Sequence, residues 1–390
     1  MKEIFSIILS VILSLFGLNT DPYDLQPLPK DEITLTQEQI ALFEQIVEGE
    51  TAWLASLQLE NGAIPMTYTA NGTVKMNPYF ADFAALALLE RSDVYAENVT
   101  KYMDWHFSRL NSAETDYNGV DGTIYDYTIT LSGGKITEES VVMTNGHGTY
   151  DSTDSYAATF LTVLAKYYEK TDDTEYILSH KEEINRITNA MFSTLHNGLT
   201  SAKPDYGVKF LMDNCEVYEG VVAATVLFEE VICPADNSYN GISEKCSNTA
   251  EEIRLSIENK LWNPVGQNYK TGIRRFLGVP ERIFSWSNYY PSATAQLFPI
   301  ICGVIQPNTQ RARNLYNRFS EEYDWVNFDY PDDFYWGANA LAAAKMADVD
   351  RVTEYMTNYA VLMETHAYPL YNADAARACL AANLMLENYA

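Results

Sequence analysis

The chain has 390 residues, of which 47% are hydrophobic and 13% aromatic, so it can bury a large core and is not expected to be disordered. Its 53 Asp and Glu residues against 26 Lys and Arg residues give a formal net charge of -27. A field of this sign repels phosphate backbones and anionic lipid surfaces. Nucleic acid and the membrane surface are therefore not expected partners, and strongly anionic polysaccharides are disfavoured.

The first twenty residues have the pattern of a secretory signal peptide. The basic residue Lys2 precedes an apolar run from Ile4 to Leu18, which is shorter than a membrane span requires. We expect residues 1–20 to be a signal peptide, with an uncleaved N-terminal anchor as the alternative, and the mature protein to be secreted or held at the cell surface. No linker or shift in composition divides residues 21–390, so we expect a single domain there.

The remaining chain alternates between two kinds of predicted helix. Helices of one kind carry charged residues, and helices of the other kind are small and apolar nearly all round. A helix that is apolar all round is buried, whereas a helix with a charged face lies at the surface. In chain order the predicted helices cover residues 36–60, 79–90, 95–110, 152–170, 175–195, 216–231, 249–261, 292–304, 310–323, 334–346, 350–363 and 373–387.

This alternation predicts twelve helices arranged as six helical hairpins, with an outer and an inner layer closed into a ring. The expected fold is therefore an all-α protein, an (α/α)6 barrel. An open α-solenoid or an irregular helical domain is the alternative, and the regular alternation favours the closed ring. Residues 122–143 have the signal of a β-hairpin that turns at Gly133 and Gly134, and residues 269–284 contain a second strand-like segment. Both segments precede inner helices, so we expect both on the face where those helices begin.

The five cysteines and five histidines show no spacing typical of metal ligands, so no metal site is expected. Neither a GxGxxG nor a P-loop motif is present, and no cofactor is expected. Cys233 and Cys246 flank a short loop and are the best candidates for a disulfide in an oxidising compartment.

Two local segments add to the helical alternation. Residues 53–58 read WLASLQ and residues 151–158 read DSTDSYAA. With the alternation, they resemble the six-hairpin glycosidase-like superfamily. The resemblance covers most of the mature sequence as architecture, and it does not select one subfamily. It implies a substrate cleft where the inner helices begin and cleavage of glycosidic bonds, in many members with inversion.

Acidic residues open several of the predicted inner helices. Glycoside hydrolysis needs one protonated carboxyl for the leaving oxygen and a second carboxylate that activates water. We expect these groups to come from Asp151 or Asp154 and from Asp213 or Glu216, with Asp154 the strongest candidate. The spacing within each pair is also that of a helix N-cap and its partner, so helix capping is the alternative.

Aromatic residues gather before or at the same helices. An aromatic ring can stack on the C–H face of a sugar, although packing at the mouth of the barrel is the alternative for any one ring. The predicted substrate-binding residues are Tyr79, His147, Tyr150, Trp286, Tyr290, Asp333, Tyr335 and Trp336.

These observations predict a secreted, carbohydrate-active enzyme that hydrolyses an oligo- or polysaccharide with paired carboxylates and inversion. A non-catalytic glycan-binding or surface-interaction protein on the same barrel is the alternative. A polysaccharide lyase is a weaker alternative, because a lyase needs basic residues to neutralise a uronate. Lys203, Lys209, Arg274 and Arg275 lie in predicted loops and could serve that purpose. Sugar, linkage and oligomeric state are not predicted.

Overall fold

The structure is a computed structural model, which describes residues 23–29, 32–276, 279–283, 286, 288–331, 334–367 and 370–390. The predicted signal peptide lies outside these ranges. Within them, none of the helices combines the length and apolar character needed to cross a membrane.

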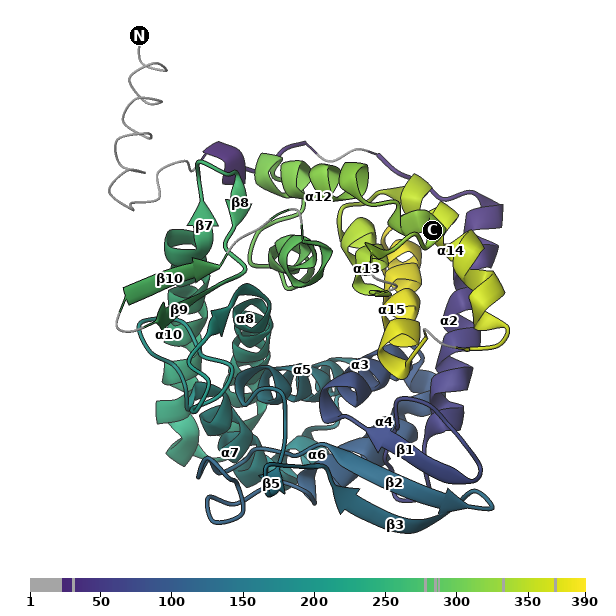
Figure 1. Cartoon of the computed structure of the whole chain (residues 1–390). Coiled ribbons are helices and arrows are strands. Elements are labelled where there is room, and N and C mark those ends of the chain that lie inside the picture. The colour runs from purple at the N-terminus through teal and green to yellow at the C-terminus, as the bar shows by residue number, and fades with distance from the viewer. Residues whose placement is uncertain are drawn as a thin grey trace.

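Six inner helical segments form a closed ring (Figure 1). Each inner segment packs against the next around the ring, and the last one packs against the first. In ring order they are α3 (Pro78–Leu89), α5 (Asp154–Thr171), α8 (Leu211–Val226), the run η5 (Tyr289–Ala293), η6 (Thr294–Leu297) and α11 (Phe298–Ile301), then α13 (Ala338–Lys345) and α15 (Asn372–Tyr389).

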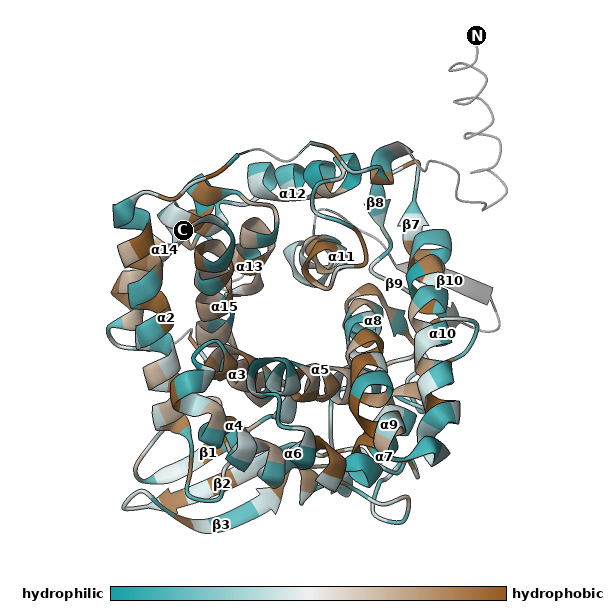
Figure 2. Ribbon diagram, turned by 180° about the vertical axis from the view of Figure 1, so that it is seen from behind, coloured by the Kyte–Doolittle hydropathy of each residue, from teal (hydrophilic) through white to brown (hydrophobic). Residues whose placement is uncertain are grey.

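An outer layer surrounds this ring. Its helices, such as α12 and α10, carry many hydrophilic residues, which are teal in Figure 2. The outer helices are α2 (Gln37–Leu57), α4 (Ser92–Phe107), α6 (Thr174–Ser179) with α7 (Lys181–Phe192), α10 (Asn240–Ser256), α12 (Gln310–Glu322) and α14 (Val349–Met363). The predicted all-α barrel of alternating outer and inner helices is therefore confirmed. Short helical turns complete the chain: η1 (Tyr23–Leu25), η2 (Leu227–Ile232), α9 (Cys233–Ala235), η3 (Asn237–Tyr239), η4 (Ile257–Leu261) and η7 (Trp325–Asn327).

Two predicted helices are broken, each for a local reason. The predicted helix 292–304 is a run of π-, 3-10 and α-helical turns that contains Pro291 and Pro299. Proline has no N–H to donate, so it interrupts the regular hydrogen bonds of an α-helix. The predicted helix 175–195 is two helices that meet at His180, whose φ of -112° is not helical. The His180 ring stacks on Phe107 at 4.2 Å between centroids.

The start of α8 also differs from the prediction, and this difference affects the acids. The helix begins at Leu211, five residues before the predicted start at residue 216. Asp213 is therefore inside the helix, in its first turn, rather than in the loop that precedes it. Similarly, α13 begins only at Ala338, after Gly337, although the pattern predicts a start at residue 334.

Each of the two predicted strand segments contributes two strands to a three-stranded antiparallel sheet, and the third strand of each sheet comes from outside the predicted segment. The first sheet has the order β1 (Gly72–Met76), β2 (Tyr127–Ser132) and β3 (Lys135–Val141), and β1 was not predicted. The second has the order β10 (Val279–Ile283), β9 (Gly272–Phe276) and β6 (Lys209–Phe210). Because β1 is followed directly by α3 and β6 by α8, both sheets lie where inner helices begin, as expected. Two short pairs are β4 (Met143–Thr144) with β5 (His147–Gly148), and β7 (Trp262–Asn263) with β8 (Asn268–Tyr269).

All five cysteines are free thiols, so the conditional disulfide between Cys233 and Cys246 is not formed in this structure. Cys246 is buried and Cys233 is half-buried, which is the usual environment of a cysteine that serves as a small apolar residue.

Small residues let the inner helices approach each other closely. At Gly220 on α8, an added Cβ would lie 2.5 Å from Cα and 2.8 Å from the backbone oxygen of Ala158 on α5. Real Cβ atoms do not approach backbone this closely, so a larger residue at position 220 would force the two helices apart.

We expect Gly220→Ala to destabilise the protein. Overpacking costs about 1–3 kcal/mol, and a clash with backbone belongs at the upper end of that range. This overpacking cost exceeds the gain of about 1 kcal/mol that replacing Gly by Ala brings in a helix interior. The measurement is the midpoint of thermal or denaturant unfolding. Gly207→Ala is the matched control, because nothing lies within 4 Å of the Cβ position there. Equal midpoints for the two variants would contradict the close contact.

Candidate active site

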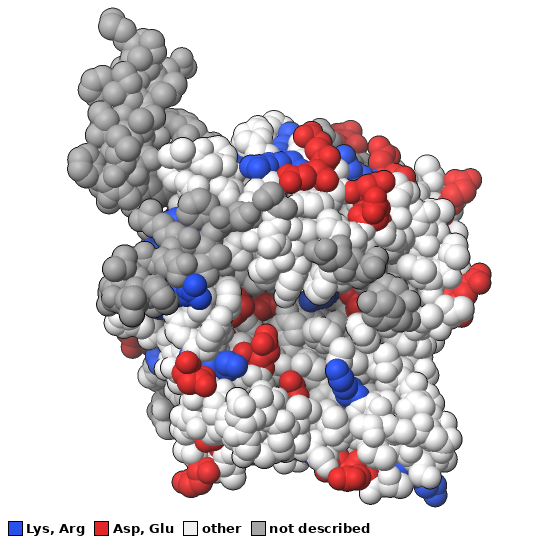
Figure 3. Space-filling view, viewed as in Figure 1, with Lys and Arg blue, Asp and Glu red and all other residues white. Residues whose placement is uncertain are grey.

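A cleft of about 370 Å³ lies at the ends of the inner helices where these helices begin. All six inner segments contribute to it, mostly from their first two turns or from the residues just before them. Its lining residues are Asn77, Tyr79, Phe80, Asp151, Ser152, Ser155, Tyr156, Met212, Asp213, Glu216, Tyr290, Phe298, Phe334, Trp336 and Arg377. Figure 3 shows this face of the ring, with acidic side chains in the hollow near its middle.

Aromatic rings form much of the cleft wall. Tyr290 and Phe334 are 46% and 39% exposed, and their ring centroids lie 4.3 Å apart. On the other side, Tyr79 stacks on Tyr156 at 5.9 Å, and Trp336 adds a third surface that is largely buried. Exposed rings that are held by neighbouring rings suit the apolar face of a sugar.

Three of the four predicted catalytic acids line the cleft. Asp151 is exposed in the loop before α5, Asp213 is half-buried, and Glu216 is buried one turn further along α8. The capping alternative does not describe them. The N-cap of α5 is Thr153 and that of α8 is Phe210, and neither helix has a side-chain cap.

The environment of Asp213 favours the protonated form of its carboxyl. Burial raises the pKa of its carboxyl well above the usual range, and the nearby negative charges of Asp154, Glu216 and Asp151 raise it further. Burial also raises the pKa of Glu216 to about 7. A raised pKa is the property that a proton donor needs, so Asp213 is a candidate for this role.

Glu216 is held by its neighbours. The hydroxyl of Tyr79 donates a hydrogen bond to its Oε1, and this bond partly offsets the rise in the pKa of Glu216. The positive charge of Arg377 acts in the same direction. Arg377 is buried on α15 with its guanidinium 4.4 Å from the Phe83 ring, and it is the only cation among the described lining residues.

Asp154 lies behind the cleft rather than in its lining. It is fully buried at the start of α5, and its Oδ1 accepts a hydrogen bond from the N–H of Ser155. Its Oδ2 has no hydrogen-bond partner in the described part of the chain. Burial raises the pKa of Asp154 to about 6. Its contribution to the cleft is therefore its charge beside Asp213.

Of the eight predicted substrate-binding residues, Tyr79, Tyr290 and Trp336 line the cleft. Asp333 lies outside the described residues. The other four pack elsewhere. His147 and Tyr150 lie in the insertion before α5, and Trp286 and Tyr335 pack against outer helices.

His147 and Tyr150 belong to the insertion before α5. The ring of His147 stacks on Tyr117 at 4.1 Å, and its Nδ1 lies 2.8 Å from the backbone oxygen of Gly148. Tyr150 is buried, and its hydroxyl accepts a hydrogen bond from Asn118. Both residues therefore help to hold the insertion together.

Trp286 and Tyr335 pack against outer helices. The guanidinium of Arg318 on α12 lies 4.2 Å from the Trp286 ring. The hydroxyl of Tyr335 is hydrogen-bonded to that of Tyr355 on α14. For these two rings, packing at the mouth of the barrel describes the structure better than contact with a sugar.

The sequence interpretation missed a polar cluster at one end of the cleft. Asn77, the N-cap of α3, donates from Nδ2 to the hydroxyl of Tyr156 at 2.7 Å and to Oδ1 of Asp126 at 3.1 Å. The Tyr156 hydroxyl donates to the same Asp126 oxygen at 3.0 Å. Burial and, to a smaller extent, the charge of Asp151 raise the pKa of Asp126 to about 7.

Arg377 was missed too, although the sequence contains a signal for it. It is an isolated charge in the run Ala375-Ala376-Arg377-Ala378, inside a helix that is predicted to be buried. Asp126 has no such signal, because it lies between two tyrosines in an insertion. No group of three or more His, Cys, Asp or Glu residues in the described ranges is arranged to hold a metal ion.

No protein-family model and no curated protein matches this sequence. Solved structures do match the fold. A wild-type glycosidase has a TM-score of 0.57 at 11% identity, with 90% of this chain and 98% of that chain covered. A GH63 mannosylglycerate hydrolase from Thermus thermophilus in complex with glucose has a TM-score of 0.58 at 11% identity, covering 86% and 99%. An alpha-amylase from Clostridium perfringens has a TM-score of 0.52 at 11% identity, covering 87% and 97%. The chain therefore has the six-hairpin glycosidase-like fold.

The raised pKa of Asp126 predicts how stability depends on pH. Between its ordinary value of 3.8 and its folded value of about 7, the folded protein holds a proton that the unfolded chain has released. The free energy of unfolding therefore loses a contribution as the pH rises through this window. Asn at position 126 does not titrate, so Asp126→Asn should remove that contribution.

The measurement is denaturant unfolding of the wild type and Asp126→Asn at pH 4, 5.5, 7 and 8. The stability of the wild type relative to the variant should fall steadily between pH 4 and 7. Asp350→Asn, at an exposed site on α14, should show no such trend. A relative stability that is constant or rises over this range would contradict the assignment.

Proposed function

We propose that this protein is a glycoside hydrolase in which Asp213 donates the proton and Asp151 activates water. The observation that carries the proposal is the cleft. It brings together Asp213, whose pKa is raised, and the exposed Asp151 from different elements, beside a wall of aromatic rings. The fold shared with glycosidases supports the same reaction class.

The proposed reaction is a single displacement. Asp213 gives its proton to the glycosidic oxygen as the bond to the anomeric carbon breaks. Asp151 accepts a proton from a water molecule that attacks that carbon from the opposite face, and the new hemiacetal has the inverted configuration. Proton exchange with solvent then restores both carboxyls. Inversion needs space for the water, with carboxyls about 6.5–9.5 Å apart.

Asp151 suits this role better than Glu216. Asp213 and Glu216 lie one turn apart on the same face of α8, whereas Asp151 comes from the loop before α5. Glu216 instead acts through Asp213, since its negative charge helps to keep the proton on that residue. In this proposal it is a positioning residue.

The substrate in this proposal is an oligo- or polysaccharide whose sugar rings contact Tyr290, Phe334 and Trp336. The N-terminal apolar run supports the further proposal that the enzyme acts outside the cytoplasm. The test of that proposal is N-terminal sequencing of the protein from its native host. A mature protein that begins near residue 21 would support secretion, and an intact N-terminus in the cytosolic fraction would contradict it.

The two alternatives make different demands on the cleft. A glycan-binding protein would gain nothing from an acid that is crowded by three other carboxyls, because this arrangement favours proton transfer rather than adhesion. A polysaccharide lyase would need cations beside the substrate. Two of its candidates, Lys209 and Arg274, line a separate pocket, so the cleft offers Arg377 alone among its described lining residues.

The first test is Asp213→Asn on a panel of glycans. We expect kcat to fall by about 10²–10⁴-fold on natural glycans, because a general acid contributes that much. The loss should be far smaller on aryl glycosides whose leaving group needs no proton. Asp350→Asn should retain full activity, and the thermal midpoint should show that Asp213→Asn is folded. Full activity of Asp213→Asn would overturn its role, and glycan binding without hydrolysis by the wild type would favour the binding protein.

The second test is Asp151→Asn. Because the proposed base is needed whatever the leaving group, activity should fall on natural and activated substrates alike. Nuclear magnetic resonance of the first product formed by the wild type should show the inverted anomer. A retained anomer would exclude the single displacement.

The third test is Tyr79→Phe, with the pH profile of kcat/KM as the readout. Loss of the hydrogen bond raises the pKa of Glu216, so this residue carries less negative charge at a given pH. The pKa of Asp213 then falls, and the basic limb of the profile should move to lower pH. Tyr168→Phe, elsewhere on α5, is the control and should leave the limb in place. A limb that moves to higher pH would contradict the role given to Glu216.

A further inference from the structure

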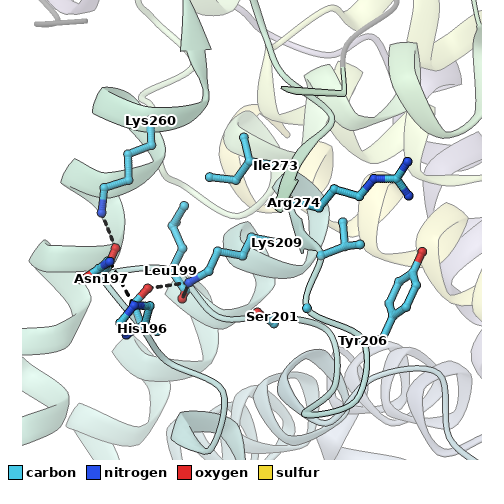
Figure 4. A pocket seen from close by; sticks show the side chains of 11 residues that line it. His196, Asn197, Leu199, Ser201, Tyr206, Lys209, Lys260, Ile273 and Arg274 are labelled. Carbon is cyan, nitrogen blue, oxygen red and sulfur yellow. Dashed lines mark hydrogen bonds between the residues drawn. The ribbon is translucent and has the colours of Figure 1, made fainter. Parts of the chain in front are cut away.

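We propose that a second pocket, which is separate from the cleft, binds a sugar that carries a carboxylate, such as a uronate unit of a glycan. We call it the basic pocket; its volume is about 650 Å³, within the range of about 300–1,000 Å³ that is typical of small-molecule sites. Its lining residues are His196, Asn197, Leu199, Ser201, Tyr206, Gly207, Val208, Lys209, Lys260, Ile273 and Arg274, most of which are labelled in Figure 4. It shares no lining residue with the cleft.

Three cations line this pocket although the chain has a net charge of -27. Lys209 comes from β6, Lys260 from η4 and Arg274 from β9. In the described part of the chain, neither lysine lies within ion-pair distance of a carboxylate. Unpaired lysines beside each other repel, so a bound anion would stabilise both.

Hydrogen bonds hold both ammonium groups in place, and each ammonium still has one N–H that can donate to a ligand. Lys209 donates to the backbone oxygens of His196 and Leu199, as Figure 4 shows. Lys260 donates to the backbone oxygen of Asn197 and to the hydroxyl of Ser256. An ammonium has three N–H donors, so each lysine keeps one for a ligand. Burial and the charge of Lys260 lower the pKa of Lys209 to about 8, so it is still charged at neutral pH.

The rest of the pocket suits the body of a sugar. Leu199, Val208 and Ile273 provide apolar walls, and the ring of Tyr206 is 46% exposed. In Figure 4 the side chains of Tyr206 and Arg274 lie on the opposite side of the pocket from the two ammonium groups. A uronate offers both features that this arrangement requires, a carboxylate at one edge and C–H groups on its face. The choice of a sugar rests on the proposed function, whereas the choice of an anion rests on the pocket alone.

The test is isothermal titration calorimetry of the full chain with glucuronate, methyl glucoside and inorganic phosphate. We expect glucuronate to bind at least ~10-fold more tightly than methyl glucoside, which matches one charge-assisted hydrogen bond. Lys209→Met and Lys260→Met should each weaken glucuronate binding by a similar factor. Lys135→Met, an exposed site at the start of β3, is the control and should not change it.

Equal affinities for glucuronate and methyl glucoside would overturn the proposal. Phosphate that binds as tightly as glucuronate would overturn the sugar and leave only an anion site. If both lysine variants fail to fold, Tyr206→Ala serves instead, since its exposed ring can be removed without opening the core. Unchanged glucuronate binding by that variant would also overturn the sugar. Glucuronate binding with no hydrolysis of any glycan would contradict the proposed function and leave the basic pocket intact.

Discussion

The close packing of small residues around the inner ring is the constraint on which the rest of the structure depends. Where Gly220 meets the backbone of Ala158, α5 and α8 lie too close for any larger side chain. Six inner segments packed in this way bring their first turns together around one cleft. Residues that are up to 300 positions apart in the chain, from Asn77 to Arg377, thereby line one cavity. The electrostatics of the site follow from this crowding, since burial and the neighbouring carboxylates raise the pKa of Asp213.

The same crowding separates the roles of the four acids. Asp151 is in the loop and faces solvent, so it suits a base. Burial and the neighbouring carboxylates raise the pKa of Asp213, which suits a proton donor. Asp154 is buried behind the lining, and one of its oxygens lacks a partner in the described structure. An aromatic wall and one buried guanidinium complete the cleft.

The architecture was predictable from the sequence because burial controls composition. The alternation between charged helices and helices rich in alanine identified the two layers, and the helix predicted from residue 36 corresponds to α2, whose N-cap is Thr36. The individual site residues were less predictable. In the sequence, His147, Tyr150 and Tyr335 stand before or at predicted inner helices, as Tyr79 and Tyr290 do. Only the packing of the insertion and of the outer helices keeps them out of the cleft lining. Asp126 lies in a loop whose path is set by hydrogen bonds to Asn77 and Tyr156, which are distant in sequence. Helix starts also differed, and the earlier start of α8 moved Asp213 from a loop into a helix.

The strand β6 connects the basic pocket to the cleft along the chain. It pairs with β9 on one side and runs without a break into α8, so Lys209 and Asp213 lie four residues apart on one continuous segment. The basic pocket and the proposed proton donor are therefore built on one continuous stretch of backbone, although the pocket and the cleft share no lining residue.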